Sequence, residues 1–151
     1  MHLAVLRSFR VIYGSVRQHF RNVQRSCGIS GSQLWILHEL TQAPGIGVSE
    51  LAQRLSIHQS TCSLLIEKLA RAGYVKKSRS KADQRRVGLQ VSGEGQRCMK
   101  RAPGPPEGLL PEAVAGLSLP QARALCKSLQ SVIAELDVRV DEAADTPLSD
   151  L

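Results

Sequence analysis

The stretch LAQRLSIHQSTCSLLIEKLARAGYVKKSRSKADQRRVGLQVS, residues 51–92, predicts two short helices, a glycine stop and a basic hairpin in that order. Three apolar residues share one face of the first helix, which we expect over residues 49–55. A turn follows, in which Ile57 is a predicted buried plug. This order of elements is typical of a winged helix-turn-helix, so we expect a mainly α fold with one small β hairpin (α+β).

The second helix should run from Gln59 to Arg71, because its apolar residues recur at the helical period. The residues predicted to face inward are Cys62, Leu65, Ile66 and Leu69. The opposite face is mostly small and polar, as a helix that enters a groove of DNA requires. The candidate DNA contacts on and before this helix are His58, Gln59, Ser60, Thr61, Ser63, Leu64 and Lys68.

A basic hairpin follows the second helix. Gly73 supplies the left-handed stop, and residues 74–78 and 87–91 are the predicted strands. Residues 58–90 hold eight cations and two anions, a balance of +6 in a chain of formal charge +7. Such clustering indicates a phosphate-binding surface rather than a solvated loop. The candidate wing residues are Lys76, Lys77, Arg79, Lys81, Asp83, Arg85 and Arg86.

These residue types suggest that some side chains contact bases and others contact the phosphate backbone of DNA. Gln59 can pair with adenine in the major groove, and the methyl group of Thr61 can touch thymine. Lysines such as Lys68 more often meet the phosphate backbone, which positions the protein without reading sequence. The wing would lie along or in the adjacent minor groove, whose width an inserted arginine senses.

The pattern resembles the MarR family of bacterial transcriptional regulators. The residues that carry the resemblance are Leu51, Ala52, Leu55, Ser60, Thr61, Ser63, Leu69, Gly73, Asp83, Arg85, Leu89, Val91 and Ser92. The resemblance implies a sequence-specific DNA-binding regulator, a repressor released by a small aromatic or phenolic ligand. It also implies that Asp83 holds the wing arginine while Arg85 or Arg86 reaches DNA. Leu64 and Gln84 depart from the family, whose members often carry arginine at these positions.

In relatives of this family the ligand lies between the dimer helices and the winged domain. The residues that the resemblance places there are Tyr13, Arg17, His19, Trp35 and His38. Each of them is also compatible with an ordinary role in the core, the interface or the surface.

Helices with an apolar seam flank the predicted winged domain, which we place at residues 30–92. Spacings of three and four mark the seams in residues 3–26 and in the last helix of residues 93–145, and Ser118 caps that last helix. A Pro-Gly-rich break at residues 103–106 interrupts the second region. The first helix is basic and the last is acidic, so we expect the ends of two chains to interleave in a homodimer. Such a dimer would set its recognition helices about 34 to 36 Å apart on a pseudo-palindromic site in double-stranded DNA.

Length and composition agree with a single domain over residues 1–151, ending in a disordered tail at 146–151. With 42% hydrophobic residues the chain can bury one core, and it has no run of about 18 apolar residues that would span a membrane. The first ten residues do not resemble a signal peptide. We therefore expect a cytoplasmic protein with no membrane partner.

The sequence offers little for catalysis or cofactors. It has no nucleophile elbow, no phosphate-binding glycine loop and no His or Cys set at metal-ligand spacing, so we expect no enzyme, no metal and no cofactor. The four cysteines fit small buried hydrophobes, and Cys27 is the candidate for the alternative, a redox-sensing regulator. A second alternative is a winged-helix module that binds DNA non-specifically or binds a protein partner.

Overall fold

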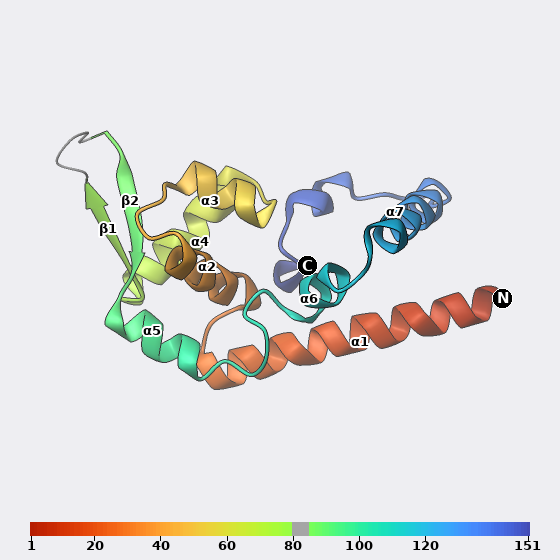
Figure 1. The fold of residues 1–151 in the computed structure, drawn as a ribbon, viewed down its shortest axis with the longest axis horizontal. Helices are drawn as coiled ribbons and strands as arrows, with labels where there is room; N and C mark the ends of the chain where they lie inside the picture. Colours follow the sequence, from red (N-terminus) through yellow and green to blue (C-terminus); the bar gives the residue numbers. More distant parts are fainter. Residues whose placement is uncertain (80–84) are drawn as a thin grey trace.

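A computed structural model describes residues 1–79 and 85–151 of the chain. It is mainly helical with one antiparallel hairpin, as the sequence predicts (Figure 1). The helices are α1 (His2–Cys27), α2 (Gly31–Gln42), α3 (Val48–Leu55), α4 (Gln59–Arg71), α5 (Gly93–Lys100), α6 (Leu109–Ala115) and α7 (Leu119–Ala134). The strands are β1 (Val75–Arg79) and β2 (Val87–Val91), and two short 3-10 helices, η1 (Asp141–Asp145) and η2 (Leu148–Asp150), end the chain.

The core lies where α2, α3 and α4 meet the base of the hairpin. The four inward residues predicted for α4 are all buried, and Leu69 has no exposed surface. Ser56 turns the chain between α3 and α4 with a φ of 53°, and Ile57 packs against the core as predicted. The helical period of the apolar residues therefore fixed α3 and α4 to within one residue of their predicted bounds.

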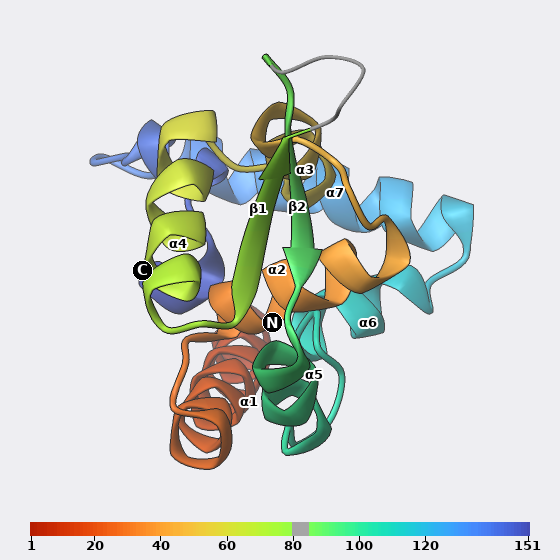
Figure 2. The same cartoon turned by 90° about the vertical axis from the view of Figure 1, so that its left-hand side faces the viewer.

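The hairpin is anchored at its base on both sides. Gly73, with a φ of 80°, turns the chain after the end of α4. Strand β1 begins one residue later than predicted. Val75 pairs with Val91 and Arg79 with Val87, and the backbone of Leu89 exchanges hydrogen bonds with Gly45 and Ile46 at 2.8 and 3.0 Å. These bonds hold β2 against the loop before α3, so the hairpin projects from a fixed base (Figure 2).

Two helices extend away from the winged part toward one end of the molecule (Figure 1). In α1 only the last turns are buried, because Val23 and Cys27 pack in the core while residues 1–15 are exposed. No residue of α7 is buried, although its apolar residues include Leu125 and Leu129. The predicted capping box at Ser118 is present at the start of α7. The apolar seams therefore exist, and a single chain leaves most of their surface in solvent.

The Pro-Gly-rich break separates α5 from α6, as predicted. Helix α5 ends at Lys100 and α6 begins at Leu109, because the intervening prolines lack the backbone N–H that a helix interior requires. Ser92 caps α5 through a hydrogen bond from the Gly95 N–H, and its own hydroxyl donates to the Gly73 carbonyl. This serine joins the base of the wing to the segment that follows it.

The C-terminal segment differs from the sequence prediction in two respects. Helix α7 ends at Ala134, so the acidic residues from Glu135 onward lie after the last α-helix, which itself carries only basic charges. The prediction of an acidic last helix is therefore wrong; residues 136–140 include Val138 and Val140, whose branched side chains disfavour helix. Residues 146–151 pack on α2 instead of forming the expected disordered tail: the Ser32 N–H donates to Ser149 Oγ at 2.9 Å.

Candidate nucleic-acid interface and adjoining cavity

Helix α4 presents its first turn to solvent beside the hairpin. Gln59 and Ser60 are exposed, and Thr61 and Ser63 are half-buried on the flanks of the same face. Leu64, one turn further on, is 61% exposed, and Lys68 extends the face toward the end of the helix. The structure thus brings all of the predicted recognition-helix residues to one surface. Side chains at the start of such a helix are those that reach base edges in helix-turn-helix proteins.

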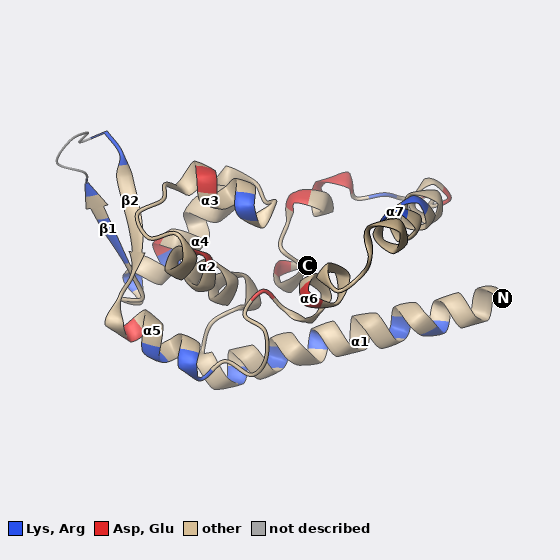
Figure 3. Cartoon of the chain, viewed as in Figure 1, with Lys and Arg blue, Asp and Glu red and all other residues tan. Residues whose placement is uncertain are grey.

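Exposed cations follow on the hairpin. Alternation along β1 places Lys76 on one face of the hairpin and Lys77 and Arg79 on the other. Arg85 and Arg86 are exposed just before β2 begins. Figure 3 shows these positive charges gathered along the projecting hairpin. Two predicted wing residues, Lys81 and Asp83, and the family departure Gln84 lie outside the described residues.

His58 occupies the N-cap position of α4, but its side chain makes no capping hydrogen bond. Its Nε2 lies 3.5 Å from Asp145 Oδ2, and its backbone N–H donates to the Asp145 carbonyl at 3.2 Å. His58, which the sequence indicated as a candidate DNA contact, thus also contacts the C-terminal segment, a role that no local pattern predicted.

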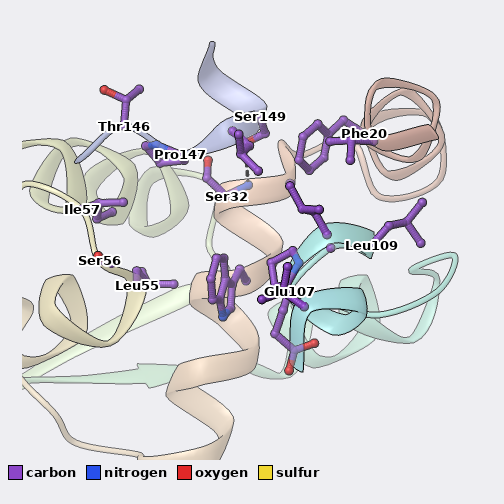
Figure 4. A pocket seen from close by; sticks show the side chains of 18 of the residues that line it. Phe20, Ser32, Leu55, Ser56, Ile57, Glu107, Leu109, Thr146, Pro147 and Ser149 are labelled. Atoms are coloured by element: carbon purple, nitrogen blue, oxygen red, sulfur yellow. Dashed lines mark hydrogen bonds between the residues drawn. The ribbon is translucent and has the colours of Figure 1, made fainter. Parts of the chain in front are cut away.

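A cavity of about 330 Å³ lies between α1, α2, α6 and the C-terminal segment (Figure 4). Its size is at the lower end of the range for small-molecule sites. Most of its lining is apolar, with two aromatic side chains from α1 and α2. The principal lining residues are Phe20, Trp35, Leu55, Ile57, Leu109, Leu110, Pro111, Val114, Pro147 and Leu148.

Of the five residues that the family resemblance placed at a ligand site, only Trp35 lines this cavity. His38 lies beside it, with its Nε2 3.0 Å from the Glu107 carboxylate, and Glu107 is a lining residue. His19 is buried next to Phe20, and burial lowers the pKa of its imidazole. Its uncharged form is therefore favoured at neutral pH.

Tyr13 and Arg17 contact each other on an exposed part of α1, where the guanidinium carbon lies 6.0 Å from the ring centre. They take no part in the cavity. Most of the lining residues that the sequence did not indicate come from residues 107–114 and 144–149, and the others come from α1, the start of α2 and the turn between α3 and α4. No local motif marks them, since only the tertiary fold brings these segments to α2.

Three of the four thiols are buried. Cys27 and Cys98 lie against each other's backbone, with Cys98 Sγ 3.4 Å from the Cys27 carbonyl oxygen. Burial raises the pKa of the Cys27 thiol, and it raises the pKa of Cys62 to about 11. A raised pKa leaves less thiolate at neutral pH than a free cysteine has, and thiolate is the reactive form. These surroundings favour the small buried hydrophobe over the redox sensor at Cys27.

Two further properties bear on the class of site. In residues 1–79 and 85–151, no group of three or more His, Cys, Asp or Glu side chains could hold a metal ion. None of the helices in this described part of the chain is long and apolar enough to cross a membrane.

The arrangement of α3, α4 and the basic hairpin defines a winged helix-turn-helix protein. Residues 29–87 match the model of the MarR family, so this part of the chain is a MarR-family domain. One relative, the HTH-type transcriptional regulator TtmR of Methylorubrum extorquens (strain PA1), is 28% identical over 110 residues, which cover 71% of this chain and 54% of the relative. The chain spans about half the length of the curated relatives it matches. The relative's role in transcription agrees with the prediction that the chain is no enzyme.

Solved structures share the fold over nearly the whole chain. A MepR-like protein in complex with pseudoligands has a TM-score of 0.60 at 17% identity, covering 87% of this chain and 94% of its own. FabT of Streptococcus pneumoniae in complex with DNA has a TM-score of 0.58 at 19% identity, covering 87% and 94%. The likeness extends beyond the winged part, so the flanking helices belong to the same fold.

Proposed function

We propose that the chain is a sequence-specific DNA-binding transcription regulator. The observation that carries the proposal is the exposed, small-polar start of α4 beside the cations of the hairpin. A surface of this kind combines side chains that can approach base edges with charges that neutralise phosphates. The family domain and the fold shared with FabT, whose structure contains DNA, support the same role. A cytoplasmic location belongs to this proposal.

Binding-site selection from random DNA tests sequence recognition. We expect the chain to enrich a pseudo-palindromic site, and Gln59→Ala to change the preferred bases by removing a side chain that can pair with adenine. Arg85→Ala with Arg86→Ala should instead weaken binding to selected and random DNA alike. Gln96→Ala is the matched control, because Gln96 is exposed on α5, away from the hairpin tip.

Selection that yields no preferred sequence would favour the alternative, a winged-helix module that binds DNA non-specifically. An absence of DNA binding altogether would favour a protein partner. Neither result is expected from a recognition helix whose polar first turn is open to solvent.

A homodimer is the second part of the proposal. The exposed apolar residues of α1 and α7 form seams that a single chain leaves in water, which is typical of an interface. The exposed members are Leu3, Leu6, Phe9, Ile12 and Tyr13 on α1 and Leu125, Leu129, Val132 and Ile133 on α7. A two-fold dimer would repeat the recognition helix on successive turns of DNA.

Analytical ultracentrifugation tests the dimer. We expect a dimer for the natural chain and a monomer for Phe9→Asp, because a carboxylate in an apolar interface loses its hydration without gaining a partner. Arg10→Asp is the control: it places a carboxylate at the next position of α1, outside the seam. A monomeric natural chain would contradict this part of the proposal.

The third part concerns control by a small molecule. The apolar cavity with Phe20 and Trp35 in its wall favours a small aromatic or phenolic effector. We propose that the chain represses transcription and that an effector in the cavity releases it from DNA. Repeating the selection with phenolic compounds and with an oxidant would separate this control from a redox response, since only the phenols should lower the recovery of bound DNA.

A further inference from the structure

The C-terminal segment contacts the start of the recognition helix, and no local motif predicted this contact. η1 ends at Asp145, whose carbonyl accepts from the His58 backbone N–H at 3.2 Å. The Asp145 carboxylate lies 3.5 Å from His58 Nε2. Figures 1 and 2 both place this last part of the chain beside the start of α4. Two contacts thus connect an acidic segment to the N-cap residue of the proposed DNA-reading helix.

The position of this contact matters for DNA binding. The first backbone N–H groups of a helix have no partner within it, and the helix dipole makes this end positive. A DNA phosphate would be attracted to the same place, as anions are to helix N-termini. Because the His58 side chain makes no capping bond, its imidazole is available to an anion, and Asp145 supplies one. The carboxylate therefore lies beside the N-terminus of α4, 3.5 Å from an imidazole that could otherwise contact a phosphate.

The segment carries the charge that such competition requires. Residues 135–151 contain six of the chain's thirteen acidic residues and a single arginine, a balance of −5 in a chain of formal charge +7. Figure 3 shows this run of acidic residues on the side of the molecule that faces α3. The segment thus has the same sign of charge as the phosphate backbone and the opposite sign to the cations of α4 and the hairpin.

The segment is held at its C-terminal end, which keeps it close to α4. Helix α7 precedes it, and η2 follows it on α2, where Ser32 Oγ donates to Asp150 Oδ1 at 3.0 Å and the Ser32 N–H donates to Ser149 Oγ at 2.9 Å. A tethered group acts at a high effective concentration even when its own contacts are weak. The His58 and Asp145 side chains are 57% and 53% exposed, so the contact between them is weak enough to be displaced.

We propose that residues 141–145 form an autoinhibitory contact: their carboxylates compete with the phosphate backbone of DNA for the start of α4, and the segment leaves that position when DNA binds. This inference rests on the proposed DNA binding. The segment acts as a competitor within the chain. It lowers the affinity for DNA and so disfavours weak, non-specific sites.

Two full-length variants test the proposal in fluorescence anisotropy with a labelled duplex of random sequence. Asp145→Asn removes the carboxylate that faces His58, and we expect it to tighten binding about two- to fivefold, the effect of losing one exposed ion pair. Asp137→Asn makes the same change in net charge in the same acidic stretch, at a position that lies outside η1. It should have less than half of that effect.

Hydrogen–deuterium exchange of the natural chain supplies an independent measurement. Displacement predicts that amide exchange in residues 143–150 becomes faster when DNA is added, whereas exchange in residues 59–63 becomes slower. Equal affinities of the two variants, or slower exchange of residues 143–150 in the complex, would overturn the autoinhibitory contact while leaving DNA binding intact. If neither the natural chain nor Asp145→Asn bound DNA, both the contact and the proposed function would fail.

Discussion

The affinity of the chain for DNA is expected to fall by about a thousandfold or more when salt rises from 50 to 200 mM, if a dimer makes roughly 6 to 10 phosphate contacts. The reason is counterion release: each phosphate that a lysine or arginine neutralises frees bound cations, and added salt opposes that release. The exposed cations of α4 and the hairpin can supply these contacts. A titration by anisotropy at five salt concentrations measures the slope directly.

The hairpin's share of this slope can be isolated. Replacing Arg85 and Arg86 with alanine removes four positive charges per dimer, so the slope of log K against log salt should drop by about three to four. The control replaces Arg7 and Arg10 with alanine, which changes the net charge equally at the far end of α1. A full slope in the hairpin variant, or an equal loss in the control, would show that the wing does not contact phosphate.

Leu69→Ala is expected to lower the free energy of unfolding by about 2 to 5 kcal/mol, the usual cost of truncating a buried leucine. Leu69 has no exposed surface and lies on the buried face of α4, in the core. Truncation of its side chain therefore leaves a cavity that the surrounding helices fill only in part. Urea denaturation followed by circular dichroism measures the change. Because the whole free energy of unfolding of a small domain is only about 5 to 15 kcal/mol, this variant should unfold at a clearly lower urea concentration.

Leu64→Ala is the matched control on the same helix. Leu64 is 61% exposed, so the same truncation should change stability by no more than about 0.5 kcal/mol. Its place on the recognition face predicts an effect on DNA binding instead. If Leu64→Ala destabilised the fold as much as Leu69→Ala, the assignment of the outer face of α4 would be wrong.

The recognition helix and its surroundings could be read from the sequence because their signals are local. The spacing of Cys62, Leu65, Ile66 and Leu69 fixed both the bounds of α4 and its outward face. Gly73 marked the helix stop because only a residue without Cβ takes a positive φ at little cost. Cap chemistry at Ser118 placed the start of α7 in the same way. Each of these signals spans a few residues and requires no knowledge of the rest of the chain.

The cavity and the C-terminal contact were decided only by the tertiary structure. Phe20, Trp35 and Pro147 line one cavity although they lie on three separate segments of the chain, so no spacing predicts them. The tail at residues 146–151 was expected to be disordered, yet Ser149 and Asp150 are held by Ser32 on α2. Local pattern therefore determined a winged helix-turn-helix and the exposed face of α4. Long-range packing determined what lies against that face, because hydrogen bonds between distant segments exist only after the chain has folded.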